Sequence, residues 1–165
     1  MPDHIPDPIW DPVADSGLAT FIRESIWAYP ALETLHLFGL ALLFGPILMF
    51  DLRVLGRSRD FNIRRLHQTL LPWVWTGFLL NLASGCLMFV SDAAEFARNP
   101  AFLAKLAFLA AAGANALLFQ NLIFPRLPGS DDTSRLTKAA RTSAAFSILI
   151  WIAVVVAGRL MAYVK

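Results

Sequence analysis

Four long apolar blocks alternate with short polar segments along the chain. The blocks cover about residues 31–55, 70–90, 101–124 and 144–164. A helix needs about 20 mostly apolar residues to cross the hydrocarbon core of a bilayer, and each block is long enough. Short connections place consecutive helices side by side and antiparallel. The pattern therefore predicts an all-α fold, an integral membrane four-helix up-down bundle.

A shorter amphipathic segment precedes the first block. In "GLATFIRESIWAYP", residues 17–30, apolar side chains recur at helical spacing, Ser16 can cap the first turn and Pro30 interrupts the pattern. Trp27 and Tyr29 are of the residue types that favour the membrane–water interface. We therefore expect a short N-terminal interfacial helix that leads into the first span.

The beginning of the chain has a different character. Residues 1–16 contain four aspartates and four prolines. Proline fixes φ and lacks a backbone donor, so this density predicts an extended acidic tail rather than a helix. The chain then consists of an acidic, proline-rich tail over 1–16 and one membrane domain over 17–165.

Basic residues predict the orientation in the membrane. They follow the first and third blocks, whereas the first twenty residues have none. Basic segments stay on the cytoplasmic side of a membrane. We therefore expect a bacterial inner-membrane protein whose two termini face the periplasm. The two basic groups are Arg53, Arg57, Arg59, Arg64 and Arg65, and then Arg126, Arg135, Lys138 and Arg141.

Composition narrows the classes of protein further. Hydrophobic residues make up 57% of the chain, charged residues 16%, and the mean hydropathy is +0.57. The lipid bilayer is therefore the first partner that we expect. A formal net charge of +2 is too small to predict nucleic-acid binding. Cys86 is the only cysteine, so no intrachain disulfide can form.

A few polar residues interrupt the apolar blocks. If consecutive helices are aligned from their connecting loops, with about 1.5 Å of rise per residue, His36 falls level with Asn81. Lys105 and Arg159 fall about a turn nearer the outside, and Asn115 falls deeper. An ionisable residue inside a span marks a functional site by default. The candidate cofactor-binding residues are Glu33, His36, Asn81, Lys105, Asn115 and Arg159.

His36 is the residue best suited to hold a metal centre. A neutral imidazole is an axial ligand of haem iron, and Glu33 would accept a hydrogen bond from the other ring nitrogen. Lys105 and Arg159 would hold the haem propionates. His67 lies about 20 Å deeper by the same alignment, so it cannot serve the same iron.

The same polar and small residues also suit helix contacts and other ligands. Gly77, Asn81 and Ser84 share one face of the second block, as small and polar residues do at membrane helix contacts. Gly39, Gly77 and Gly113 would leave room for a flat macrocycle. Copper or another metal ion, or a quinone bound by His36 and Asn81, are alternative ligands. A polar clasp that fixes helix register is a further interpretation.

The first and third blocks carry a resemblance to known proteins. "YPALETLHLFGLALLFGPILMFDLRVLG" and "NPAFLAKLAFLAAAGANALLFQ" resemble an uncharacterised family of small bacterial membrane proteins with four helices. The general plan is also similar to the membrane domains of copper-resistance D-type proteins and to small b-type cytochromes. The resemblance covers most of residues 29–125 and implies architecture more than activity.

These observations lead to one functional expectation and two alternatives. We expect a small membrane subunit of a redox-linked system that faces the periplasm, with haem b as cofactor and His36 as metal ligand. The protein would have no independent catalytic activity. One alternative is a non-catalytic assembly or anchoring subunit, or a homo-oligomer, with a membrane or periplasmic protein partner. The other is the transport of a small solute or metal ion.

Overall fold

The computed structural model describes residues 9–57, 61–127 and 137–164. These residues form α-helices with one π-helix and one short 3-10 helix, so the all-α prediction is confirmed. In chain order the elements are α1 (Asp11–Ala14), α2 (Gly17–Glu24), α3 (Ala28–Val54), α4 (Ile63–Ser91), α5 (Ala93–Arg98), α6 (Pro100–Leu118), η1 (Phe119–Ile123), η2 (Phe124–Arg126) and α7 (Lys138–Leu160).

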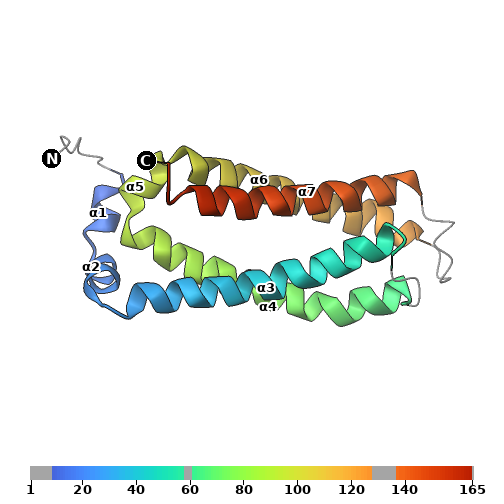
Figure 1. The fold of residues 1–165 in the computed structure, drawn as a ribbon, viewed down its shortest axis with the longest axis horizontal. Coiled ribbons are helices and arrows are strands. Elements are labelled where there is room, and N and C mark those ends of the chain that lie inside the picture. The colour runs from blue at the N-terminus through green and yellow to red at the C-terminus, as the bar shows by residue number, and fades with distance from the viewer. Residues whose placement is uncertain (1–8, 58–60, 128–136, 165) are drawn as a thin grey trace.

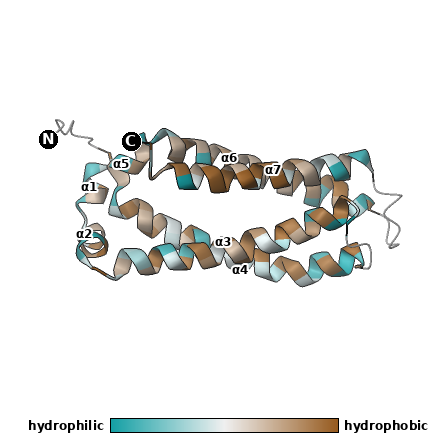
Figure 2. Ribbon diagram, in the orientation of Figure 1, coloured by the Kyte–Doolittle hydropathy of each residue, from teal (hydrophilic) through white to brown (hydrophobic). Residues whose placement is uncertain are grey.

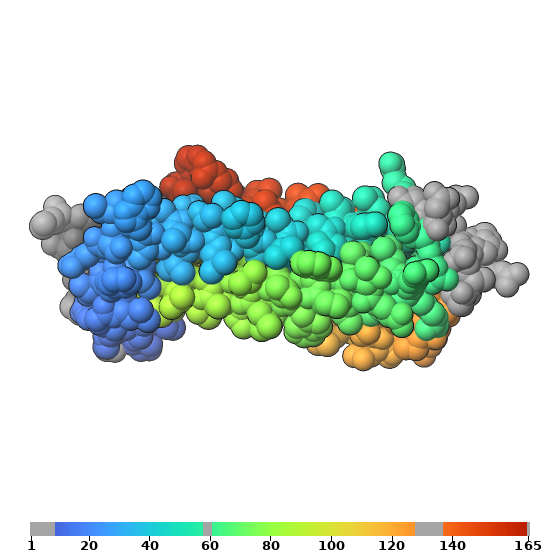
Figure 3. All heavy atoms as spheres, turned by 90° about the horizontal axis from the view of Figure 1, so that it is seen from below, coloured from blue at the N-terminus to red at the C-terminus, as the bar shows by residue number. Residues whose placement is uncertain are grey.

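The four long helices run up and down and form two antiparallel pairs. α3 packs along α4, and α6 packs along α7 (Figure 1). Seen from below, α3 and α4 lie side by side along the length of the molecule (Figure 3). We call the end with α1, α2 and α5 the terminal end, and the end where α3 stops and α4 starts the basic end. The predicted up-down bundle is confirmed.

The two pairs approach each other mainly away from the terminal end. Figure 1 shows α3 nearing α6 and α7 toward the basic end and lying apart from them toward the terminal end. Two clusters of buried hydrophobic residues join the pairs. The central cluster is Leu43, Ala112, Ile150, Trp151 and Val154. The basic-end cluster is Val54, Ile63, Leu127, Ala140 and Ala144.

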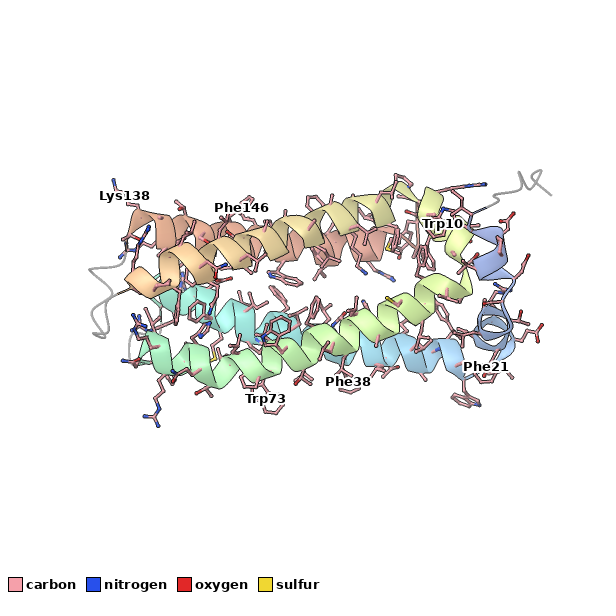
Figure 4. The ribbon with its side chains drawn as sticks, turned by 180° about the vertical axis from the view of Figure 1, so that it is seen from behind. Trp10, Phe21, Phe38, Trp73, Lys138 and Phe146 are labelled. Carbon is pink, nitrogen blue, oxygen red and sulfur yellow. The ribbon has the colours of Figure 1, made fainter. Side chains whose placement is uncertain are left out.

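Short helices cover the terminal end. Ser16 caps α2 by accepting a hydrogen bond from the Ala19 amide, as predicted. Arg23 on α2 donates to the backbone carbonyls of Ala14 at 2.7 Å and Ser91 at 2.6 Å, which fixes α2 against the end of α4. Phe21 is 64% exposed and points away from the bundle (Figure 4). This arrangement agrees with an amphipathic helix at the membrane surface.

The prediction of an extended tail over residues 1–16 is wrong for part of that range. Residues 11–14 form the short helix α1, and Pro12 lies in its first turn. The first turn of a helix tolerates proline because its amides have no partner within the helix. Residues 1–8 lie outside the described residues. Pro30 likewise lies in the first turn of α3, so the break before the first span falls at Ser25 to Trp27 rather than at Pro30.

Four segments are long and apolar enough to cross a membrane: Ala28–Val54, Ile63–Ser91, Pro100–Arg126 and Lys138–Leu160. Hydrophobic residues dominate their lengths, and hydrophilic residues gather at the two ends (Figure 2). Phe38, Trp73 and Phe146 point outward from the bundle (Figure 4) and are 65%, 54% and 53% exposed. Large exposed apolar side chains on every long helix are what a lipid-facing surface requires.

Candidate functional site

His36 lies two turns from the start of α3 and is half-buried against α4. Its Nδ1 atom is 2.9 Å from the Ser84 hydroxyl oxygen. Ser84 is completely buried, with 0% of its surface exposed. The pair therefore joins α3 to α4 on the inner faces of the two helices, in the half of the bundle nearer the terminal end.

Two hydrogen-bond arrangements are open to Ser84 and His36. In the first, the Ser84 hydroxyl donates to the Leu80 backbone carbonyl, 2.6 Å away. A serine has one hydroxyl proton, so the ring Nδ1–H then donates to Ser84 and the Nε2 atom carries the lone pair, the state in which an imidazole binds a metal. In the second, the hydroxyl donates to Nδ1 and the ring proton lies on Nε2.

Small residues allow the His36 ring to approach α4. A Cβ atom at Gly85 would lie 3.3 Å from the ring Cε1. A Cβ atom at Gly39 would lie 3.0 Å from the Asn81 backbone nitrogen. The Asn81 side-chain amide donates to the Gly77 carbonyl of its own helix at 3.2 Å. The alignment from sequence placed His36 level with Asn81, but the structure places Asn81 against Gly39 and places His36 against Ser84 and Gly85, about one turn nearer the terminal end.

Lys105 faces this group from the other helix pair. It is half-buried on α6, and a Cβ atom at Gly158 of α7 would lie 3.7 Å from its Nζ atom. Its ammonium charge is close enough to His36 to act on the ring electrostatically. We call His36, Asn81, Ser84 and Lys105 the His36 cluster. Leu43, two turns beyond His36 on α3, and Val154, one turn from Gly158, belong to the central cluster that lies beneath it.

Two predicted members of the site lie elsewhere. Glu33 is exposed, and the position next to the His36 Nδ1 atom that it was expected to fill is taken by Ser84. Arg159 is also exposed and donates to the Tyr163 hydroxyl at 2.9 Å. The predicted hydrogen bond from His36 to Glu33 is therefore wrong, because Glu33 does not share the face of α3 that contacts α4.

Asn115 contributes to a different contact. Its amide donates to the Ser143 backbone carbonyl at 3.2 Å and its carbonyl oxygen accepts from the Ser143 hydroxyl at 2.8 Å. This reciprocal pair joins α6 to α7 in the half nearer the basic end. Asn115 is thus a helix-contact residue that lies away from the His36 cluster.

The glycines expected to make room for a macrocycle have other surroundings. A Cβ atom at Gly77 would lie 2.7 Å from the Gly39 carbonyl oxygen and would also collide with the Leu43 amide. Gly39 and Gly77 therefore bring the backbones of α3 and α4 together. Gly113 is exposed, and a Cβ atom added there would meet nothing within 4 Å. The expectation of room is therefore wrong for Gly39 and Gly77, and the open space at Gly113 lies on the exposed surface of α6. The glycines that border the His36 cluster are Gly85 and Gly158.

Sequence reasoning missed a second buried polar group near the basic end. Asp51 is 6% exposed and Arg53 is 0% exposed, although both follow the apolar run of α3. Ser147 of α7, which is 9% exposed, lies near the Asp51 carboxyl group. The Arg53 Nε atom donates to the Phe61 backbone carbonyl at 2.5 Å. The signal was present in "DLRVLG", where two charges close an apolar helix.

In the described ranges, no three histidine, cysteine, aspartate or glutamate residues gather in a group that could hold a metal ion. His36 therefore offers a single imidazole nitrogen rather than a full set of protein ligands. A tetrapyrrole brings four nitrogen ligands of its own, and one axial imidazole is sufficient to attach it.

The fold and its apolar surface define a membrane protein with four candidate spans. The chain belongs to a family of unknown function, DUF6644, whose model matches residues 19–164. The match begins within α2 and includes all four long helices. No curated protein and no solved structure matches the chain.

Proposed function

We propose that this protein is a small membrane subunit of a redox-linked system, and that it carries haem b with the His36 Nε2 atom as axial ligand. The hydrogen bond between His36 Nδ1 and Ser84 is the observation that supports this function most directly. A metal-binding histidine usually donates its other ring N–H to a neighbouring acceptor, which fixes the ring and its tautomer. Ser84 has that role here.

The surroundings of His36 suit the other parts of a haem. Lys105 supplies a cation for a propionate, and Asn81 adds a polar side chain about one turn deeper than Ser84 on α4. Gly85 and Gly158 keep bulky side chains away from His36 and Lys105. When bound, haem would supply one-electron transfer, and the protein would set its position, axial ligand and electrostatic surroundings.

The distribution of basic residues supports an outward-facing site. Arg57, Arg65, Arg126, Lys138 and Arg141 all lie at the basic end and are exposed. If this end is cytoplasmic, the terminal end is periplasmic, and the His36 cluster lies in the periplasmic half of a bacterial inner membrane. The haem would then exchange electrons with a periplasmic or membrane partner.

Haemin titration of the purified apoprotein tests this function. We expect saturable binding of one haem per chain with the spectrum of a histidine ligand, and its loss in His36→Ala. His67→Ala is the matched control, because His67 lies on α4 at the opposite end and should leave binding unchanged. Equal binding by wild type and His36→Ala would refute the proposed ligand.

A clasp subunit is the second candidate, and the same hydrogen bond favours it. His36 and Ser84 join α3 to α4, so they could fix the helix register in an assembly or anchoring subunit without any cofactor. In that case the chain would be colourless, and His36→Ala would lower its stability or its retention of a partner. The titration above separates the two candidates.

A further inference from the structure

A second histidine lies between the two helix pairs near the basic end. The His67 Nε2 atom on α4 is 3.0 Å from the Gln120 Oε1 atom. Gln120 belongs to η1, the π-helix of residues 119–123 that continues α6. Over the described ranges this is the one hydrogen bond of either side chain. It links the α3–α4 pair to the α6–α7 pair at a point remote from His36.

Aromatic rings surround His67. The Phe124 ring lies against it with centroids 4.3 Å apart at 32°, and Phe50 meets it edge-on at 5.6 Å. Phe119 packs edge-on against Phe50 at 5.6 Å. On Phe124 the Arg64 guanidinium lies 5.5 Å from the ring centroid. These rings come from α3, η1 and η2 and form apolar surroundings for one polar pair.

The backbone at Gln120 is unusual. A π-helical turn is rare and less favourable than an α-helical one, and such turns occur frequently at functional sites. Here the π-helix contains Phe119 and Gln120, which contact Phe50 and His67. The π-helical turn, the hydrogen bond between His67 and Gln120, and the aromatic rings are three independent features, and they occur together near the basic end.

In the hydrogen bond between His67 and Gln120, one ring nitrogen that can accept and one amide group that can donate remain unused. When His67 Nε2–H donates to Gln120 Oε1, the His67 Nδ1 lone pair and the Gln120 amide N–H groups remain. If the amide turns over and the ring proton moves to Nδ1, the unused donor and acceptor exchange places. His67 is half-buried and Gln120 is exposed. The pair can therefore present both functions to a ligand at the bundle surface.

We propose that His67 and Gln120 bind the head group of a lipid-soluble quinone. The carbonyl oxygens of a quinone need donors, and the hydroxyls of its quinol need acceptors, and this pair supplies both. A quinone ring packs favourably beside aromatic side chains, and the rings of Phe50, Phe119 and Phe124 lie around the pair. His67 lies in the second turn of α4 and Gln120 close to the end of the third candidate span, so the ligand can enter from the membrane.

This site is independent of the proposed haem. It shares no residue with the His36 cluster and lies about 20 Å from it along the helices. Haem binding at His36 could fail without affecting quinone binding here, and the reverse also holds.

Quenching of tryptophan fluorescence by decylubiquinone tests the site. Trp73 and Trp75 lie one to two turns from His67 on α4 and are exposed reporters. We expect saturable quenching of the detergent-purified protein. His67→Phe keeps a flat ring but removes both nitrogens, and Gln120→Leu keeps the size but removes the amide. Each variant should weaken binding about 3- to 10-fold, as expected for one lost hydrogen bond.

Neighbouring polar residues provide matched controls. Gln68 follows His67 and Asn121 follows Gln120, and both are exposed. Decylubiquinone should quench the tryptophan fluorescence of Gln68→Ala and Asn121→Ala with the same affinity as that of wild type. The helical circular dichroism signal should be the same for all variants. Non-saturable quenching by wild type would overturn the proposal. So would equal affinity in His67→Phe, Gln120→Leu and wild type.

Discussion

At the residue scale, His36 is accommodated inside a membrane-spanning helix because a neighbouring helix satisfies one of its nitrogens. A polar side chain without a partner in hydrocarbon costs several kcal/mol. When Ser84 accepts a hydrogen bond from Nδ1 and donates one to the Leu80 carbonyl, the ring nitrogen, the hydroxyl and the carbonyl all have a hydrogen-bond partner. In this arrangement Nε2 keeps its lone pair, which is the state that the proposed haem ligand requires.

Replacing Ser84 by alanine tests this chain of hydrogen bonds. Ser84→Ala removes the acceptor that orients His36, and loss of such a partner typically costs about 10- to 100-fold in metal affinity. We therefore expect haemin to bind at least about 10-fold more weakly than to wild type. Equilibrium haemin titration provides the measurement.

Ser91 offers a matched control on the same helix. It is 1% exposed and also donates to a carbonyl of its own helix, that of Met88 at 2.7 Å. Ser91→Ala should retain wild-type haemin affinity. Equal affinity in Ser84→Ala and wild type would argue against an orienting role for Ser84.

The depth of single residues was predictable from the sequence to about one helical turn, but their direction was not. In an up-down bundle the loops fix depth approximately: His36 was placed level with Asn81, and the structure places it against Ser84, three residues further along α4. Glu33 lies three residues before His36, and three residues turn a helix by about 300°. The two side chains therefore diverge by about 60°, which is enough to leave Glu33 exposed.

At the element scale, the contact between α3 and α4 depends on two glycines. Gly39 and Gly77 allow the two backbones to approach closely, as small residues do at membrane helix contacts. The sequence predicted the face of α4 that holds Gly77, Asn81 and Ser84. The sequence did not predict that Gly39 and Gly77 lie at the contact between α3 and α4 and leave no space there for a macrocycle.

Alanine at Gly77 should separate α3 from α4. The new Cβ atom would lie 2.7 Å from the Gly39 carbonyl oxygen, and overpacking of this kind costs about 1–3 kcal/mol. We expect a lower free energy of unfolding, measured by denaturation of the purified protein in mixed micelles. Gly113→Ala is the control, since open space surrounds Gly113 and alanine favours a helix by about 1 kcal/mol. If both variants unfolded alike, the close contact would be refuted.

Two local elements were beyond sequence reasoning. Proline density argued against any helix in the tail, yet Pro12 fits the first turn of α1. The π-helix at 119–123 directly precedes η2, which contains Pro125, and a proline has no amide to donate and collides with the carbonyl four residues earlier. Phe119 and Gln120 within the π-helix contact α3 and α4. A hydrophobic pattern carries no signal for the kind of turn that results.

At the scale of the whole molecule, the four helices form two pairs joined mainly at the centre and the basic end. Hydropathy predicted the number and order of the helices. It could not predict the pairing, because every helix also needs an apolar face toward lipid. Lipid-facing and helix-facing positions therefore look alike in the sequence.

The basic residues predict the orientation of the whole molecule in the membrane. Alkaline phosphatase fused after Val164 should be active in a bacterial host, because this enzyme folds only in the periplasm. The same reporter inserted after Arg57 should be inactive, and green fluorescent protein at the two positions should give the opposite pattern. An active phosphatase at Arg57 would reverse the proposed topology and move the His36 cluster to the cytoplasmic half.

The absorption spectrum of the protein purified from haem-replete cells tests the central claim most directly. It should be recorded in the oxidised and in the dithionite-reduced state, for wild type, His36→Ala and His67→Ala. We predict a Soret band and sharp reduced α and β bands in wild type and His67→Ala, and their loss in His36→Ala. A colourless wild-type protein, or bands that persist in His36→Ala, would contradict His36 as the haem ligand.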